Sequence, residues 1–303
     1  AHLVSPQHRG TLDGVPGDLL GRGAGTVYTL AVLGNPSFQL NLFAANASGA
    51  VVGAPAMIAV PPAVFDNATG VTVDDIGFSA LFGGSLGFRG GVGTVALGRD
   101  RDGNALVATT YTLERDSGDP RTAVVVGRFP VGNPGAVEWT AAGYTATASA
   151  APAGGKPILD ANGEEIGRLA FLGDVTGEEG DGPSISAPTI DGAGNIWFTA
   201  AVELYDRIDT DSDGVPDASD FDTALVRAIY DEASFSYTLE LVFEAGQTFQ
   251  GQNSGRPYRI SFISVGNGNT ASEGGVWSGS ARPFAYNNID LSLVDADEVP
   301  NAD

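Results

Sequence analysis

Five aspartates and one glycine between residues 209 and 220 have the types and the spacing to bind a metal ion. Numbered from Asp209, side-chain oxygens fall at positions 1, 3, 5, 9 and 12, and a glycine falls at position 6. This is the spacing of a twelve-residue calcium loop, in which position 7 contributes its backbone carbonyl. The predicted ligands are the carboxylates of Asp209, Asp211, Asp213, Asp217 and Asp220 and the carbonyl oxygen of Val215.

The ligand chemistry of this segment favours Ca²⁺ as the cofactor. Five neighbouring carboxylates repel one another unless a cation neutralises them. Calcium takes about six to eight oxygen ligands, whereas zinc prefers nitrogen and sulfur. The alternative is a solvated acidic loop without an ion.

The residues on either side of the segment are typical of strands, not of the helices of an EF-hand. Apolar side chains alternate through residues 196–204, a period of two that predicts a strand. Residues 223–230 are rich in β-branched and aromatic types, which also favour a strand. We therefore expect residues 206–222 to be an insertion at the tip of a hairpin.

The aspartate segment resembles the calcium repeats of thrombospondin type 3 over residues 209–220, with the pattern Asp-x-Asp-x-Asp-Gly-x-x-Asp-x-x-Asp. In that family the loops occur in tandem and wrap several ions. The single copy here implies a local structural staple.

Two stretches of the chain, 102–143 and 192–246, resemble each other. Asn104 and Asn195 each follow a glycine and precede an apolar run, and Thr122 and Thr223 each begin a second run. The asparagine and the threonine lie 18 residues apart in the first copy and 28 in the second. The calcium loop accounts for the difference. Repeated strand–turn–strand units are typical of stacked or radial β architectures.

The turns of this repeat resemble a family of secreted bacterial tandem-repeat proteins with an Asn-x-x-Gly-x-x-Ala-Phe type motif. The likeness rests on Gly194-Asn195-Ile-Trp-Phe-Thr-Ala200 and, more loosely, on residues 159–171. It implies a propeller-like fold and supplies no catalytic residues.

Composition predicts an all-β protein. Of 303 residues, 43 are Gly and 17 are Pro, yet 43% are hydrophobic, which suits many short strands joined by turns. We expect a propeller-like array of about five or six small antiparallel sheets. The alternative is a β-sandwich or two β domains that meet near residue 150. The predicted parts are an N-terminal extended segment (1–25), a β-repeat domain (26–294) and an acidic tail (295–303).

The charge of the chain excludes several partners. The net charge is −22, of which residues 1–150 carry −3 and residues 151–303 carry −19. Nucleic acid and anionic membrane surfaces attract basic proteins, so we expect neither as a partner. The sequence contains no uninterrupted apolar run of about 18 residues, so we expect no membrane span.

A secreted location fits the remaining sequence features. A calcium loop of this kind suits the high calcium outside the cell. The chain has no cysteine, and a calcium ion can supply a cross-link in place of a disulfide. The first residue is Ala, as expected of a processed secretory product. Asn46 and Asn67 match the short glycosylation pattern, which is expected to arise by chance.

No catalytic set stands out. There is no Cys nucleophile and no Gly-x-Ser-x-Gly elbow, and both histidines, His2 and His8, lie near the N-terminus. Carboxylates are abundant, but surface turns explain those at 164, 165, 178, 179 and 181 better than a paired glycosidase site does. Five aromatic side chains could stack on sugars: Trp139, Trp197, Trp277, Tyr205 and Tyr258. The alternative is that they are buried side chains of strands.

These observations predict a secreted, calcium-stabilised, non-catalytic structural or assembly protein of the bacterial cell surface or extracellular matrix. Its expected partner is a second copy of itself or another surface protein. One alternative is a carbohydrate- or peptide-binding propeller, with a polysaccharide as the partner. The other is a calcium-dependent glycosidase or polysaccharide lyase, which would need converging carboxylates or an Arg/Tyr pair in a cleft.

Overall fold

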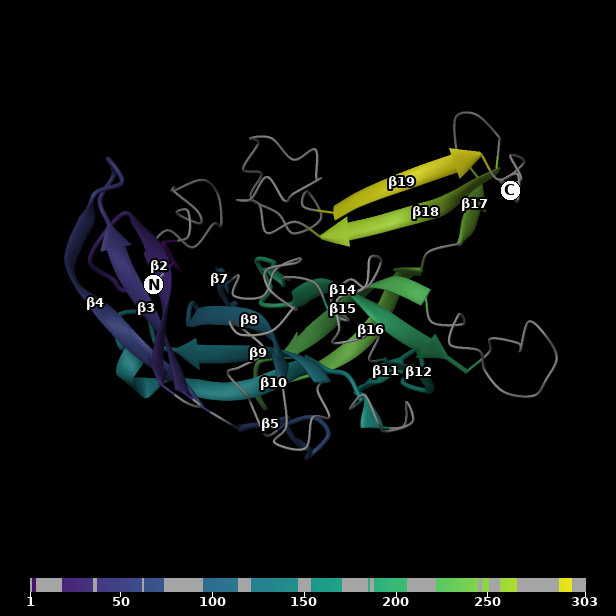
Figure 1. The fold of residues 1–303 in the computed structure, drawn as a ribbon, viewed down its shortest axis with the longest axis horizontal. Coiled ribbons are helices and arrows are strands. Elements are labelled where there is room, and N and C mark those ends of the chain that lie inside the picture. The colour runs from purple at the N-terminus through teal and green to yellow at the C-terminus, as the bar shows by residue number, and fades with distance from the viewer. Residues whose placement is uncertain are drawn as a thin grey trace.

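The computed structural model describes residues 2–3, 18–34, 37–61, 63–73, 95–113, 121–146, 154–170, 185, 188–205, 222–244, 247–250, 257–265 and 289–295. The protein is all-β, as the sequence predicts, and its strands form several antiparallel sheets (Figure 1). The helical element that lies wholly within these ranges is a single 3-10 turn, η1 (Pro134–Ala136).

The N-terminal sheet lies at one end of the molecule. It contains β1 (His2–Leu3), β2 (Gly25–Gly34), β3 (Ser37–Ala45) and β4 (Val51–Val60), in that order and antiparallel throughout. A separate two-stranded hairpin follows, β5 (Val64–Phe65) and β6 (Thr72–Val73).

The central sheet contains β7 (Val95–Arg99), β8 (Ala105–Leu113), β9 (Arg121–Phe129) and β10 (Glu138–Tyr144). Both of its faces are buried. Val107 and Val125 belong to the core shared with the N-terminal sheet, whereas Leu106 and Val124 belong to the core shared with the next sheet. A strand covered on both faces needs apolar residues at successive positions, which explains the run Ala123-Val-Val-Val126.

The barrel sheet contains β11 (Pro157–Leu159), β12 (Glu165–Leu169), β13 (Thr189–Ile190), β14 (Ile196–Leu204), β15 (Asp222–Asp231) and β16 (Ser236–Glu244). β11 runs parallel to β16, and β12 pairs with β14 as well as with β11. The second pairing of β12 closes β11, β12, β14, β15 and β16 into a small five-stranded barrel. The apolar residues that alternate along β14 all lie in its core.

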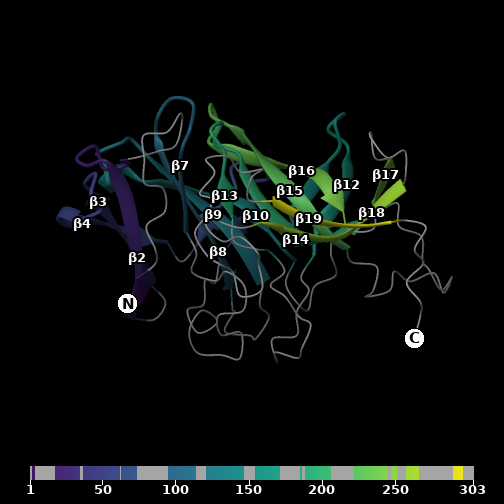
Figure 2. The same cartoon turned by 90° about the horizontal axis from the view of Figure 1, so that it is seen from above.

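A C-terminal sheet completes the described strands. It contains β17 (Thr248–Gln250), β18 (Pro257–Val265) and β19 (Ile289–Asp295). β18 lies against β14 and β15 of the barrel sheet. Figures 1 and 2 show the N-terminal sheet and the barrel sheet on opposite sides of the central sheet.

Four hairpin turns share one local design. Each begins with Asn or Asp and has Gly three positions later, at φ between +82° and +85°. In the turn from Asp191 to Asn195, the Asp191 carboxylate accepts the backbone N–H groups of Ala193 (2.8 Å) and Asn195 (3.0 Å). Glycine adopts this left-handed conformation at little cost. The four turns are 46–50, 100–104, 160–164 and 191–195.

The strand arrangement differs from the radial array expected from the sequence. The described sheets are stacked, with the central sheet between its neighbours, and one of them closes into a barrel. The described sheets do not form the radial array of a propeller. The two stretches that resemble each other lie in four-strand runs of the same order, β7–β10 and β13–β16. Because these runs pack face to face through one core, they do not form separate domains that meet near residue 150.

The start of the folded domain also differs from the predicted boundary at residue 26. Leu19 and Leu20 are buried in the N-terminal core. The Leu19 N–H donates to Thr26 Oγ1 at 2.8 Å, and Arg99 donates to the carbonyl oxygen of Asp18. Residues 18–25 are therefore part of the domain rather than a loose extended segment. Residues 4–17 and 296–303 lie outside the described ranges.

Candidate functional site

The predicted calcium ligands, Asp209 to Asp220, lie outside the described residues, so the structure describes only the two strands that hold the segment. These are β14 and β15, as the sequence predicts. They pair antiparallel from Ile196 opposite Ala228 to Val202 opposite Asp222. The ends of the segment are thus anchored on neighbouring strands of a closed barrel. Because the ends of the segment are fixed close together, it loses less conformational entropy when it binds an ion than a free peptide would.

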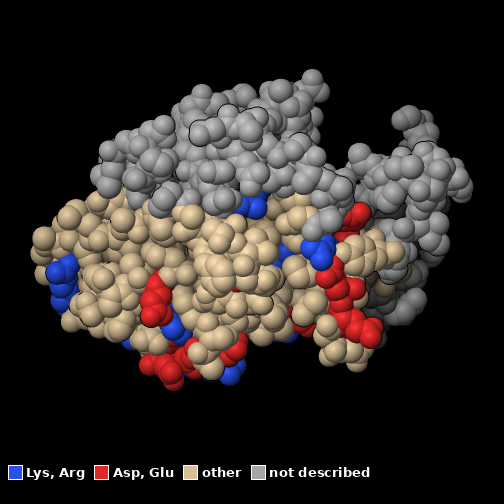
Figure 3. Space-filling view, turned by 90° about the horizontal axis from the view of Figure 1, so that it is seen from below, with Lys and Arg blue, Asp and Glu red and all other residues tan. Residues whose placement is uncertain are grey.

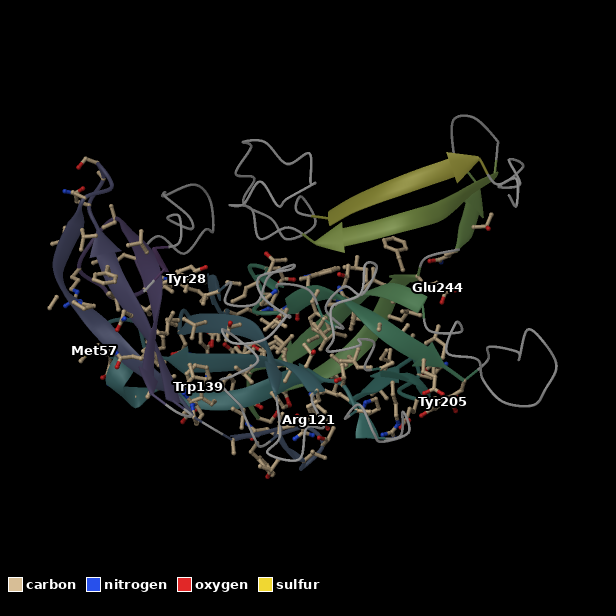
Figure 4. The ribbon with its side chains drawn as sticks, in the orientation of Figure 1. Tyr28, Met57, Arg121, Trp139, Tyr205 and Glu244 are labelled. Carbon is tan, nitrogen blue, oxygen red and sulfur yellow. The ribbon has the colours of Figure 1, made fainter. Side chains whose placement is uncertain are left out.

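A charged cluster lies beside this anchor, at the exposed end of β14. Arg168 donates to Glu165 from Nε (2.6 Å) and from Nη2 (3.0 Å), and its Nε also lies 3.0 Å from Tyr205 Oη. The Tyr205 hydroxyl donates to Glu165 Oε1. This bond and Arg168 lower the pKa of Glu165. The Tyr205 side chain remains 56% exposed, at the end of the molecule opposite the N-terminal sheet (Figure 4).

Glu203 adds a carboxylate of another kind to the same strand end. Its Oε2 atom is buried and has no hydrogen-bond partner among the residues that the structure describes. Burial raises the pKa of Glu203 because it penalises the charged form. A buried carboxylate oxygen without a donor favours a proton or a cation. Glu203 is thus a candidate acid at the base of the predicted calcium loop that sequence reasoning missed.

The other aromatic candidates have partners within the chain or lack described side chains. Trp197 donates from Nε1 to Asp191 Oδ2 at 2.9 Å, and the Arg227 guanidinium lies 5.3 Å from its ring centroid. Trp139 packs against the N-terminal core. The Tyr258 side chain and the whole of Trp277 lie outside the description. Of the aromatic candidates described, Tyr205 is the one that exposes most of its surface.

The predicted carboxylate candidates do not converge on one site in the described part of the chain. Glu164 closes the turn that begins at Asp160, where its N–H donates to the Asp160 carboxylate at 2.8 Å. Glu165 belongs to the cluster with Arg168. The positions 178, 179 and 181 are outside the described ranges. No described group of three or more His, Cys, Asp or Glu side chains is arranged to hold a metal ion.

A second candidate site is the outer surface of β4, the edge strand of the N-terminal sheet. Val51 and Met57 are 54% and 67% exposed, and among the described strands β4 pairs only with β3. Figure 4 shows Met57 at this end of the molecule. Between residues 19 and 65 the chain carries a single charged side chain, Arg22. In Figure 3 this end is tan apart from one blue patch, whereas the red patches lie along the lower middle and toward the opposite end.

Net charges summed over residues 1–150 and 151–303 do not reveal this neutral end. Counted over residues 1–65, the sequence holds two acids, Asp13 and Asp18, and two bases, Arg9 and Arg22. A shorter counting window would have found it. That these residues share one edge sheet depends on the fold.

No helix in the described part of the chain has the length and apolar character that crossing a membrane requires. Comparisons with protein-family models, curated proteins and solved structures found no match to this chain.

Proposed function

We propose that this protein is a calcium-stabilised, non-catalytic structural or assembly protein, secreted to the bacterial cell surface or extracellular matrix, that binds further copies of itself through β4. The observation that carries the proposal is the uncharged, apolar outer surface of β4 in a chain of net charge −22. Calcium, held by residues 209–220, stabilises the connection between β14 and β15.

Electrostatics favours a second copy as the occupant of β4. Two strongly acidic molecules repel over about 8 Å, the screening length at physiological salt. Contact through their acidic surfaces brings like charges together, whereas contact through β4 does not. Burial of apolar surface there contributes about 25 cal/mol per Å².

The backbone of β4 supports the same mode of association. An edge strand presents N–H and C=O groups that a strand of a second molecule can pair with. Gly53, at φ +73°, and Pro55 interrupt the first half of β4. The stretch available for pairing is therefore residues 56–60, which includes Met57.

The test is the oligomeric state of the purified chain by sedimentation velocity. We expect reversible self-association that strengthens as salt screens the residual repulsion. Met57→Lys should weaken it about tenfold or more, because an unpaired charge in the interface costs at least about 1.4 kcal/mol. Ile229→Lys is the matched control, since Ile229 is 39% exposed on β15. A chain that is monomeric at every salt concentration would contradict the proposal.

Polysaccharide binding is the second candidate, and the exposed Tyr205 beside Glu165 and Arg168 favours it. An aromatic ring next to hydrogen-bonding groups suits the apolar face and the hydroxyls of a sugar. Affinity electrophoresis in gels that contain acidic or neutral polysaccharides distinguishes the two. Retardation that Tyr205→Ala abolishes and Met57→Lys leaves intact would favour this candidate.

A further inference from the structure

The only lysine of the chain, Lys156, is buried against an aspartate. Lys156 is 1% exposed and Asp66 is 0% exposed, and Lys156 Nζ lies 2.9 Å from Asp66 Oδ2. Asp66 follows β5, and Lys156 precedes β11. The pair therefore joins the β5–β6 hairpin to the barrel sheet across 90 residues of sequence.

Hydrogen bonds hold both side chains in place. Asp66 Oδ1 accepts the Ala68 N–H at 2.9 Å, and Oδ2 accepts the Thr69 hydroxyl at 2.7 Å. Lys156 Nζ donates to the carbonyl oxygen of Ala141 at 3.2 Å. The Thr69 hydroxyl also lies 3.0 Å from Tyr144 Oη, which extends the chain of hydroxyl groups.

The Lys156 backbone is held equally well. Its N–H donates to the carbonyl oxygen of Tyr144 at 2.9 Å, and its own carbonyl oxygen accepts the Leu169 N–H at 3.1 Å. The amine and the carboxyl group are thus positioned from both chain segments. Reacting atoms held at about 3 Å by a rigid surrounding gain much of the advantage of an intramolecular reaction.

A buried ion pair alone is a weak explanation for this arrangement. Removing two charges from water costs more than their attraction returns in many proteins, and apolar replacements are frequently as stable. Burial lowers the pKa of Lys156, which favours the neutral amine, the nucleophilic form of lysine. Burial also raises the pKa of Tyr144, so that its hydroxyl keeps its proton.

We propose that Lys156 and Asp66 form an intramolecular amide (isopeptide) bond between Nζ and Cγ. A proton passes from the ammonium group to the carboxylate, which leaves an amine and a carboxylic acid. The Nζ lone pair attacks Cγ, and the bond from Cγ to Oδ2 breaks. The departing oxygen accepts the Thr69 hydroxyl hydrogen bond, takes a second proton from the nitrogen beside it, and leaves as water. Atoms and charge balance, with no oxidant or co-reactant.

The surroundings also suit the product. The amide keeps one N–H, which can donate to the Ala141 carbonyl oxygen, and keeps Oδ1, which can accept the Ala68 N–H. The cross-link ties the β5–β6 hairpin to the barrel covalently in a chain that has no cysteine. This inference is independent of the proposed self-association.

The first experiment is the intact mass of the purified full chain after denaturation. We expect a mass lower than that of the sequence by one water molecule. Trypsin should release a branched peptide that joins residues 23–89 to residues 129–168, because no arginine lies within either stretch before its end and Lys156 is followed by Pro157. A chain of full mass, whose denatured Lys156 reacts with an amine reagent, would overturn the proposal.

The matched variant is Lys156→Met, which should keep the full sequence mass. If it still loses water, the loss arises elsewhere, for instance from a succinimide at Asp66, and the proposal is wrong. Thr69→Val keeps both reacting groups and removes the hydroxyl that donates to the leaving oxygen, Asp66 Oδ2. It should slow the mass change about tenfold or more, within the range for general acid–base catalysis. An unchanged rate would overturn the role assigned to the Thr69 hydroxyl.

Discussion

Asn67 donates a hydrogen bond from Nδ2 to the carbonyl oxygen of Phe235 at 2.8 Å, and so links the β5–β6 hairpin to the turn between β15 and β16. Phe235 is the only non-glycine residue with positive φ in the described chain, at +46°. Its ring is buried, with the Arg128 guanidinium 4.3 Å from the centroid and Tyr230 in edge contact at 6.3 Å. A left-handed backbone costs a residue with a side chain about 1–2 kcal/mol. The ring packing and the Asn67 bond offset that cost.

We predict that Asn67→Ala lowers the free energy of unfolding by about 1 kcal/mol, the net worth of one hydrogen bond with its acceptor left unpaired. Urea unfolding measures it. Asn162→Ala is the control, because Asn162 donates only to Asp160 within its own exposed turn. A larger loss at 162 than at 67 would contradict this account of the turn.

Closure of the barrel depends on Gly167. A Cβ atom there would overlap the carbonyl oxygen of Glu203 and the side chain of Leu204, where β12 meets β14. Gly167→Ala should therefore destabilise the protein by about 1–3 kcal/mol, the usual range for overpacking. Gly192→Ala meets open space and should have little effect. Equal melting temperatures for the two variants would show that β12 and β14 are not this close.

The calcium prediction has its own thermodynamic test. An ion that binds only the folded protein stabilises it by about 2.7 kcal/mol when present at a hundred times its dissociation constant. Asp213→Ala should lower the melting temperature in calcium and leave it unchanged in chelator. Asp102→Ala removes an acid from another turn and should show no such dependence. An equal effect of Asp213→Ala in both conditions would exclude a calcium role for this residue.

Alkaline pH should destabilise the protein through Tyr28, which is buried, and Tyr230, which is partly buried. Burial raises the pKa of Tyr28 and of Tyr230 from 10.0 to about 12. Between these values the unfolded chain loses the phenol protons and the folded chain keeps them. Stability is therefore complete below pH 10.0 and falls as the pH rises toward about 12.

Phenolate absorbance and urea unfolding, from roughly one unit below this window up to its upper limit near pH 12, measure both quantities. Tyr28→Phe should make the loss of stability with pH shallower. It should also lower stability at neutral pH, because the Val95 N–H that donates to Tyr28 Oη at 3.0 Å loses its acceptor. Titration of all tyrosines together near pH 10, with stability unchanged, would contradict the prediction.

Local features of the fold could be predicted from the sequence. The all-β class and the strands β14 and β15 on either side of the aspartate segment follow from alternation, residue type and turn residues. Such features depend on contacts between residues a few positions apart, because side-chain direction alternates along a strand and an Asx side chain binds the N–H groups that follow it. The six calcium ligands remain a prediction, since they lie outside the described residues.

Long-range relationships could not be predicted in this way. The stacking of the central sheet, the closure of β12 on β14, and the meeting of Lys156 with Asp66 each join segments that are far apart in the chain. Each arises because a sheet with an apolar face must bury that face against another element. Several segments of the chain are apolar enough to cover it, so the sequence does not show which one does. The composition shows that one lysine exists. Packing alone buries it against a carboxylate.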